Sequence, residues 1–261
     1  MKERLVVIGG DAAGMSAASQ AKRRRGDDLE IVVFERGPEV SYAACGEPYY
    51  ISGDIPDLAD LRARTPEQFA KAGIAANLLH EVVAIDTAAG LVTVRDVSNG
   101  TKTTTGYDQL LYATGAAPIL PPWDGIDLDG VFPLKTLADA DAIRRAVLAR
   151  PARAIVVGGG YIGLEVAEAL DANGIPVRIL TLGPGVLART LDEDLGGAVA
   201  ARIRDMGIPV HDGAVVTGFS GSSGRVTTVH TESGEDFPAD LVVLALGTEP
   251  ESDLAEAAGI P

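Results

Sequence analysis

The stretch Ala154–Leu170 reads AIVVGGGYIGLEVAEAL and decides the fold. A short β-branched apolar run leads into Gly158, Gly160 and Gly163, spaced G-x-G-x-x-G, and an alanine- and leucine-rich helical pattern follows. Glycine in such a turn lets the chain bend sharply, lets the backbone approach a phosphate and lets the helix pack on the strand. The helix amino terminus also offers free N–H groups. The stretch therefore predicts a βαβ unit that binds a dinucleotide.

A second copy of this pattern opens the chain. A predicted strand at Arg4–Ile8 leads to GGDAAG at Gly9–Gly14, and a helix runs to about Arg25, where Gly26 supplies a stop. The middle glycine position is occupied by Asp11, so this turn is the less perfect of the two.

The acid expected for ribose binding separates the two copies. It should end the second strand of each unit, about 20 residues after the turn. Glu35 follows the predicted strand Glu30–Phe34 and fits this role, whereas Thr181 follows the predicted strand Pro176–Leu180. Because Thr181 is neither an acid for NADH nor an arginine for the NADPH phosphate, the choice between these nucleotides stays open.

The two halves form a weak internal repeat, in which each βαβ unit carries an inserted antiparallel hairpin and a closing strand. The predicted hairpins cover Leu91–Thr105 and Val215–Thr231, and the predicted closing strands are Gln109–Ala113 and Leu241–Leu246. We expect an α/β fold of two Rossmann-like domains, the first at residues 1–118 with a return over 247–261, the second at 119–246. The first domain is expected to contain a capped helix beginning at Thr65, and the second a helix near Ala138–Leu148.

The composition excludes several classes of function. The net charge is −15, which disfavours nucleic acid or anionic membrane as a general partner. The basic run at Lys22–Arg25 is the local exception, and it is also what complements a helix C-terminus. No signal peptide or membrane span is visible, and one cysteine allows no internal disulfide, which favours a cytoplasmic protein. The three histidines lie far apart in sequence, so no metal site is expected.

The single cysteine, Cys45, lies in SYAACGEPYYISG at Ser41–Gly53, a segment predicted to be a polar loop. A lone cysteine is commonly an inert buried side chain. A thiolate near an oxidised flavin, however, can exchange electrons with it, and a helix amino terminus favours the thiolate. On spacing alone the inert and the redox-active interpretations are balanced.

These pieces together resemble the pyridine nucleotide–disulfide oxidoreductase superfamily, and most closely its single-cysteine branch, typified by coenzyme A-disulfide reductases. The resemblance rests on GGDAAGMSAASQAKR, VVFE, SYAACGEPYYISG, RTPEQF, YATGAAP, VVGGGYIGLEVAEAL and LALGTEP, in family order. It implies FAD in the first unit, NADH or NADPH in the second, and Cys45 cycling between a thiolate and a mixed disulfide with coenzyme A.

The resemblance also assigns roles to residues. It implies catalytic roles for Cys45 and for Glu165, which it places beside the nicotinamide and the flavin. The cofactor-binding positions it implies are Gly9, Gly10, Asp11, Ala12, Ala13, Gly14, Glu35, Arg36, Ala113, Thr114, Gly115, Gly158, Gly160, Tyr161, Ile162, Gly163, Thr181 and Gly247. Coenzyme A contacts are implied for Ser16, Gln20, Arg23 and Ser41, with Arg23 holding a phosphate.

Three features depart from the branch. Ala44 stands where asparagine is common, and Glu47 stands where leucine is usual. A carboxylate close to the thiol would raise the thiol pKa, and the alternative is an exposed loop charge. Family members also continue into a Gly-Asp flavin segment and a dimerisation domain. We therefore expect this chain alone to hold FAD poorly and to lack reductase activity, and a homodimer for the full family length.

Three other interpretations remain. A single-cysteine NADH oxidase or peroxidase would cycle Cys45 through a sulfenic acid, but that branch has a histidine where this chain has Ala12. Persulfide or polysulfide reduction would use the same thiol as the coenzyme A reaction. From a different class comes a nucleotide-binding module without turnover.

Overall fold

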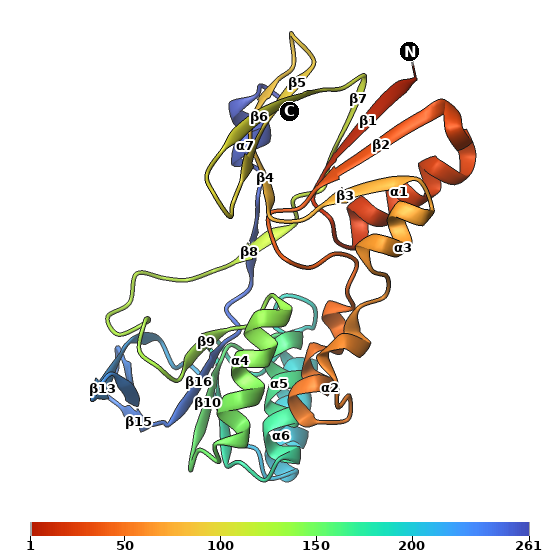
Figure 1. The fold of residues 1–261 in the computed structure, drawn as a ribbon. Helices are drawn as coiled ribbons and strands as arrows, with labels where there is room; N and C mark the ends of the chain where they lie inside the picture. Colours follow the sequence, from red (N-terminus) through yellow and green to blue (C-terminus); the bar gives the residue numbers. More distant parts are fainter. Residues whose placement is uncertain (1, 261) are drawn as a thin grey trace. The chain divides into compact units, whose positions relative to one another are not determined.

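The computed structural model describes residues 2–260, which form two compact units (Figure 1). The first unit comprises Met1–Ala43, Ala59–Ala117 and Pro250–Pro261, and the second comprises Ala44–Leu58 and Pro118–Glu249. Residues 44–58, which the expected boundary assigns to the first domain, thus cluster with the second unit. The chain also passes between the units within strands β8 (Ala116–Pro118) and β17 (Thr248–Pro250).

The first unit is built on a four-stranded parallel sheet with the order β3-β2-β1-β7. Alternate residues of β1 enter two different cores, because side chains of a strand alternate between faces. Leu5 and Val7 pack with the helices, and Val6 and Ile8 pack with an antiparallel sheet. The strands are β1 (Glu3–Ile8), β2 (Leu29–Phe34), β3 (Ile74–Asn77), β7 (Gln109–Tyr112) and antiparallel β4 (His80–Asp86), β5 (Leu91–Asp96) and β6 (Lys102–Gly106); the helices are α1 (Ala12–Arg25), α3 (Pro66–Lys71) and α7 (Asp253–Ala257).

The second unit repeats this plan around a five-stranded parallel sheet with the order β12-β11-β10-β16-β9. Ile155 and Val157 of β10 share a core with the antiparallel strands. The strands are β9 (Val131–Pro133), β10 (Ala154–Val157), β11 (Val177–Leu180), β12 (Val210–His211), β16 (Leu241–Leu244) and antiparallel β13 (Val216–Ser222), β14 (Arg225–Thr231) and β15 (Asp236–Pro238); the helices are α2 (Glu47–Ser52), α4 (Leu137–Leu148), α5 (Tyr161–Ala172) and α6 (Glu193–Asp205).

The predicted fold class is confirmed, and the differences concern insertions and short elements. Each predicted hairpin gains a third strand, β4 in the first unit and β15 in the second. The capping box at Thr65 is present, and Gly26 ends α1 with its N–H bonded to the Lys22 carbonyl. Helix α6 escapes sequence analysis because Gly196 and Gly197 lower its helical propensity. No helix within residues 2–260 combines the length and apolar character needed to cross a bilayer.

Candidate functional site

The two glycine turns have the same construction. Gly9 (φ +105°) follows β1, and a Cβ there would lie 2.0 Å from the Ala113 carbonyl oxygen. Gly158 (φ +117°) follows β10, and a Cβ there would lie 2.2 Å from the Ala245 carbonyl oxygen. Only glycine fits either position, because both the left-handed backbone and the lack of space exclude a side chain.

The last glycine of each turn lets its helix approach the strand. A Cβ on Gly14 would lie 1.9 Å from the Gly9 carbonyl oxygen, and a Cβ on Gly163 would lie 2.0 Å from that of Gly158. The two turns therefore share the same close contacts between helix and strand.

The middle position shows why Asp11 does not disturb the backbone of the first turn. Asp11 (φ −102°, ψ −154°) and Gly160 (φ −81°, ψ −177°) are both extended N-cap residues of the helices that follow. A Cβ on Gly160 meets no atom within 4 Å, so a side chain is tolerated there. The Asp11 carboxylate accepts a hydrogen bond from the Tyr42 N–H at 3.2 Å.

Helices α1 and α5 begin without a side-chain cap, as do α2, α6 and α7, whereas α3 and α4 begin with complete capping boxes at Thr65 and Thr136. The first-turn N–H groups of α1, which include those of Ala12 and Ala13, therefore receive no capping side chain. An uncapped N-terminus behind a glycine turn fits a phosphate group, which accepts from such N–H groups and is attracted by the positive dipole end. The starts of α1 and α5 both meet this condition.

Glu35 lies directly beside the first turn, at the carboxyl end of β2. Its carboxylate accepts hydrogen bonds from the N–H groups of Gly10 and Gly37, each at 2.7 Å. Each carboxylate oxygen retains a further lone pair, so the side chain is held in place and can still accept from a ribose hydroxyl.

A pocket of about 170 Å³ opens at the carboxyl ends of β1, β2 and β7, where the strand order of the first unit reverses. Such a switch point is where open α/β sheets bind their ligands. Five predicted or neighbouring cofactor positions meet there; the pocket lining includes Gly9, Glu35, Arg36, Tyr112 and Thr114.

The segment after β17 completes this pocket. The Glu251 carbonyl oxygen accepts from the hydroxyls of Tyr112 at 2.6 Å and Thr114 at 2.8 Å. Its carboxylate pairs with Arg36 at 2.6 Å, and this hydrogen bond raises the pKa of the guanidinium. The Glu251 N–H donates to the Gly115 carbonyl oxygen at 3.0 Å. Sequence analysis missed Glu251, because nothing in the spacing marks a residue 215 positions from its partner.

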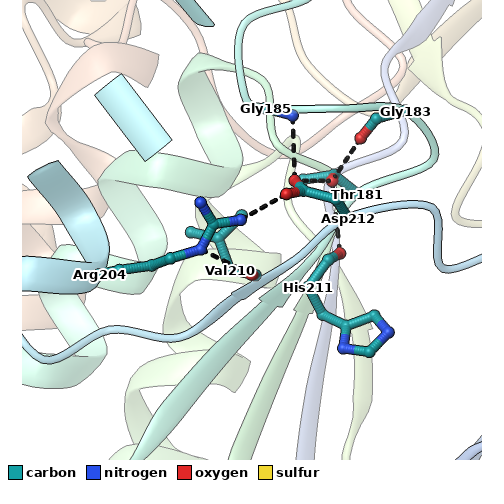
Figure 2. A network of polar contacts seen from close by, with 7 residues as sticks. All are labelled: Thr181, Gly183, Gly185, Arg204, Val210, His211 and Asp212. Carbon is teal, nitrogen blue, oxygen red and sulfur yellow. Dashed lines mark hydrogen bonds and ion pairs between the residues drawn. The ribbon is translucent and has the colours of Figure 1, made fainter. Parts of the chain in front are cut away.

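In the second unit Thr181 occupies the place that Glu35 occupies in the first. Gly9 donates its N–H to the residue before Glu35, and Gly158 donates to the residue before Thr181, both at 2.9 Å. Thr181 is buried, however, and its hydroxyl is bonded within the protein to Gly183 at 2.8 Å and Asp212 at 3.2 Å (Figure 2). Asp212 is a second residue that sequence analysis missed.

Three further predicted positions of the second unit are exposed on helix α5. Tyr161 and Ile162 begin α5 and are exposed, and Glu165, one turn later, is exposed as well. Gly247 (φ +99°) follows β16 and accepts from the Ile119 N–H at 3.0 Å.

The segment around Cys45 is not the predicted polar loop. Cys45 lies in a short 3₁₀ turn (Ala44–Gly46) that leads into α2, and its thiol is exposed. Helix α2 packs beside α4 and α5 and buries Tyr50 and Ile51 (Figure 1). The sequence pattern hid this helix because it is only six residues long and contains a proline.

Glu47 also differs from expectation. The interpretation as an exposed loop charge is wrong, since the side chain is only 4% exposed at the start of α2. A carboxylate in the first helical turn is favoured by the helix dipole, which gives a local reason for its position.

Tyr50 anchors the helix that follows Cys45, and we expect Tyr50→Phe to lower the free energy of unfolding by about 1 kcal/mol. Its hydroxyl donates to the Asp141 carboxylate at 2.9 Å. Burial, together with this bond, raises the Tyr50 pKa above its ordinary 10.0. The stabilisation is therefore present below about pH 10 and is lost as the pH rises through the raised pKa. Urea unfolding of Tyr50→Phe beside the exposed Tyr49→Phe measures the difference, and equal losses in the two variants would contradict the anchor.

The predicted coenzyme A residues of the first unit lie mainly on α1. Ser16, Gln20 and Arg23 form one exposed stripe, and the Arg23 guanidinium donates to the Gln20 side-chain oxygen at 2.7 Å. Ser41 has a left-handed backbone (φ 52°) and donates its N–H to the Gly10 carbonyl oxygen at 3.0 Å. Cys45 belongs to the second unit.

The basic run that ends α1 is largely paired locally. Lys22 lies 3.2 Å from Asp27, and Arg25 lies 2.7 Å from Glu3. Among the described residues, no group of three or more histidine, cysteine or acidic side chains could hold a metal ion.

Comparison with known proteins places the chain in a family. The model of the family described as pyridine nucleotide-disulphide oxidoreductase matches residues 3–261. An NAD(P)H sulfur oxidoreductase (CoA-dependent) of Pyrococcus abyssi is 39% identical over 100% of this chain and 57% of its own length. An NADH oxidase of Methanocaldococcus jannaschii is 35% identical over 98% of this chain. A coenzyme A disulfide reductase of Staphylococcus haemolyticus is 31% identical, again over 98%.

Solved structures that superpose on this chain carry names of the same kind of enzyme. The reduced CoADR-RHD of Bacillus anthracis superposes with a TM-score of 0.93 at 32% identity, covering 99% of this chain and 46% of that one. The water-forming NADH oxidase of Lactobacillus brevis, bound to NADH, gives 0.91 at 32%, covering 98% of this chain and 56% of that one. The chain thus spans about half the length of the relatives it matches. It belongs to the pyridine nucleotide-disulphide oxidoreductase family.

Proposed function

We propose that the protein uses FAD to pass reducing equivalents from NADH or NADPH to Cys45, and through it to coenzyme A disulfide or a related persulfide or polysulfide. The observation that carries the proposal is the pair of matched, uncapped glycine turns in a chain with one cysteine, whose thiol is exposed. When bound, the flavin would accept two electrons from the nicotinamide and supply them to the sulfur chemistry.

The first unit would hold FAD. Glu35 has acceptor capacity left for the ribose, and the uncapped start of α1 fits the pyrophosphate. Thr114 and Arg36 line the pocket at the same sheet edge, and we assign them to the adenosine half.

The second unit would hold the nicotinamide nucleotide. The open space at Gly160 lets a pyrophosphate approach the start of α5, which has no side-chain cap. Tyr161, Ile162 and Glu165 are exposed on the first turns of that helix. We assign Glu165 and Gly247 to the nicotinamide end.

Cys45 would carry the sulfur chemistry. Its thiolate attacks one sulfur of the substrate disulfide, the S–S bond breaks, and one coenzyme A thiolate leaves while a mixed disulfide forms on Cys45. Two electrons then return Cys45 to the thiolate and release the second thiol. Anionic coenzyme A suits the stripe of Ser16, Gln20 and Arg23, where a guanidinium is available for phosphate. The left-handed Ser41 is assigned to the same ligand.

The names of the relatives support two reactions, disulfide or sulfur reduction and oxidation of NADH by oxygen. We favour the first, because the first glycine turn has Ala12 where a sulfenate-forming branch has histidine.

Product analysis tests this choice. The protein as expressed from its own reading frame is expected to release coenzyme A thiol when coenzyme A disulfide and NADH or NADPH are both present, with no dimedone adduct on Cys45. A dimedone-trapped sulfenate with no coenzyme A release would assign the oxidase reaction instead. If neither product forms although the nucleotide still binds, the protein is a binding module.

A further inference from the structure

We propose that Asp212 replaces the missing acid of the second nucleotide site and makes that site prefer NADH to NADPH. The inference rests on the proposed function, because it concerns the nucleotide bound by the second turn. It assigns the preference to a side chain on the strand next to the expected one.

Asp212 follows β12 and reaches the position where Thr181 ends β11 (Figure 2). Its Oδ1 accepts from the Thr181 hydroxyl at 3.2 Å and from the Gly185 N–H at 3.0 Å. In the first unit the corresponding residue, Glu35, provides the carboxylate itself. A carboxylate oxygen thus stands one hydrogen bond from the place where the repeat puts the ribose-binding acid.

The chain on which the nucleotide would lie is fixed in position. Thr181 is 4% exposed and Leu182 is 75% exposed, so the chain emerges to solvent directly after β11. It returns at Leu187, whose N–H donates to the carbonyl oxygen of Gly159 in the glycine turn at 2.8 Å. Because Asp212 holds Gly185 between these two ends, its charge keeps a defined place in the site.

Arg204 is a cation that could bind a phosphate, but it is paired with Asp212. The Arg204 guanidinium donates to Asp212 Oδ2 at 2.5 Å and to the Val210 carbonyl oxygen at 3.0 Å. Figure 2 shows Asp212 between Arg204 and the chain near Gly185. The pair is partly exposed, with 40% of the Arg204 and 38% of the Asp212 side chain accessible.

More carboxylates surround the same segment. Asp192 and Glu193 line a cavity of about 220 Å³ together with Pro184. The acids Asp212, Asp192 and Glu193 therefore lie around the segment that follows β11, against two cations, Arg204 and the segment's own Arg189, whose Nη1 lies 3.9 Å from a Cβ built on Gly247. A 2′-phosphate is strongly anionic and would be repelled there, whereas the uncharged 2′-hydroxyl of NADH would not. We expect at least about a tenfold tighter Kd for NADH.

Calorimetric Kd values for NADH and NADPH test the inference without turnover. Asp212→Asn removes the charge, keeps the shape and frees Arg204. It should tighten NADPH binding by about tenfold while changing NADH binding by less than about threefold. Arg204→Gln removes the cation instead, and it should weaken NADPH binding below that of the unaltered protein. Asp129→Asn is the matched control, because it removes the acid of another exposed ion pair in this unit, Asp129–Arg225 at 2.9 Å, and should leave the ratio unchanged.

The outcomes separate the inference from the proposed function. An unchanged NADH/NADPH ratio in a folded Asp212→Asn protein overturns the inference and leaves the function standing. Failure of both nucleotides to bind the unaltered protein overturns the function. If Asp212→Asn does not fold, the two Kd values of the unaltered protein are measured at rising ionic strength. The difference between NADH and NADPH must then shrink if the preference is electrostatic and must stay constant if it is steric.

Discussion

In the protein expressed from its own reading frame and loaded with FAD, Cys45→Ser is expected to lower disulfide reduction by a factor on the order of 10³ or more while the flavin remains reducible by nicotinamide nucleotide. Cys45 is the only cysteine of these 261 residues, so no other thiol within them can take over the exchange. Serine keeps the size of the side chain but forms no disulfide and ionises far above neutral pH. Because the thiol is exposed, the substitution leaves the core unchanged.

Stopped-flow absorbance separates the two half-reactions. Flavin reduction should proceed in Cys45→Ser at a rate near that of the unaltered protein, and oxidation by coenzyme A disulfide should fail. Ala43→Ser is the control, since it adds a hydroxyl to an exposed position in the same segment and should retain both half-reactions. Full disulfide turnover in Cys45→Ser would remove the thiol from the mechanism.

Substitution of two glycines of the second turn is expected to separate folding from nucleotide binding. In Gly163→Ala the new methyl group would lie 2.0 Å from the Gly158 carbonyl oxygen. The helix must move off the strand, and we expect a loss of about 3 kcal/mol or more in the free energy of unfolding. In Gly160→Ala the methyl group meets no protein atom within 4 Å, so stability should change by less than about 1 kcal/mol.

Nucleotide affinity, in contrast to stability, should depend on Gly160. Gly160→Ala fills the space through which a pyrophosphate would approach α5, so we expect NADH binding at least about tenfold weaker in a folded protein. Urea unfolding and calorimetry on the same preparations give both quantities. Unchanged affinity in Gly160→Ala would mean that the turn does not face a phosphate.

Sequence alone predicts the parallel sheets because their strands are short β-branched runs directly before glycine turns. It also predicts Glu35 at the first site, since the acid is adjacent in sequence to its strand. Asp212 and Glu251 reach their places from distant segments, 31 and 215 residues from Thr181 and Arg36. No local pattern carries such contacts, and they form only when the strands pair.

The departure at Asp11 shows a different limit. The glycine pattern treats the middle position as a requirement of the fold, but the backbone there is extended in both turns, and a Cβ on Gly160 meets no protein atom within 4 Å. A side chain is therefore compatible with the fold at this position, and what glycine provides there is room for the phosphate rather than for the protein. Helix α2 escaped for a related reason: its stability comes from packing on α4 and α5 rather than from its own six residues.

The central claim is that the two turns hold a flavin and a nicotinamide nucleotide that exchange electrons. An anaerobic visible spectrum of the protein, loaded with FAD and expressed from its own reading frame, tests this most directly. We predict flavin bands that bleach on addition of NADH and, more weakly at equal limiting concentration, of NADPH. A protein that binds no flavin, or whose flavin bands persist with both nucleotides, would contradict the account.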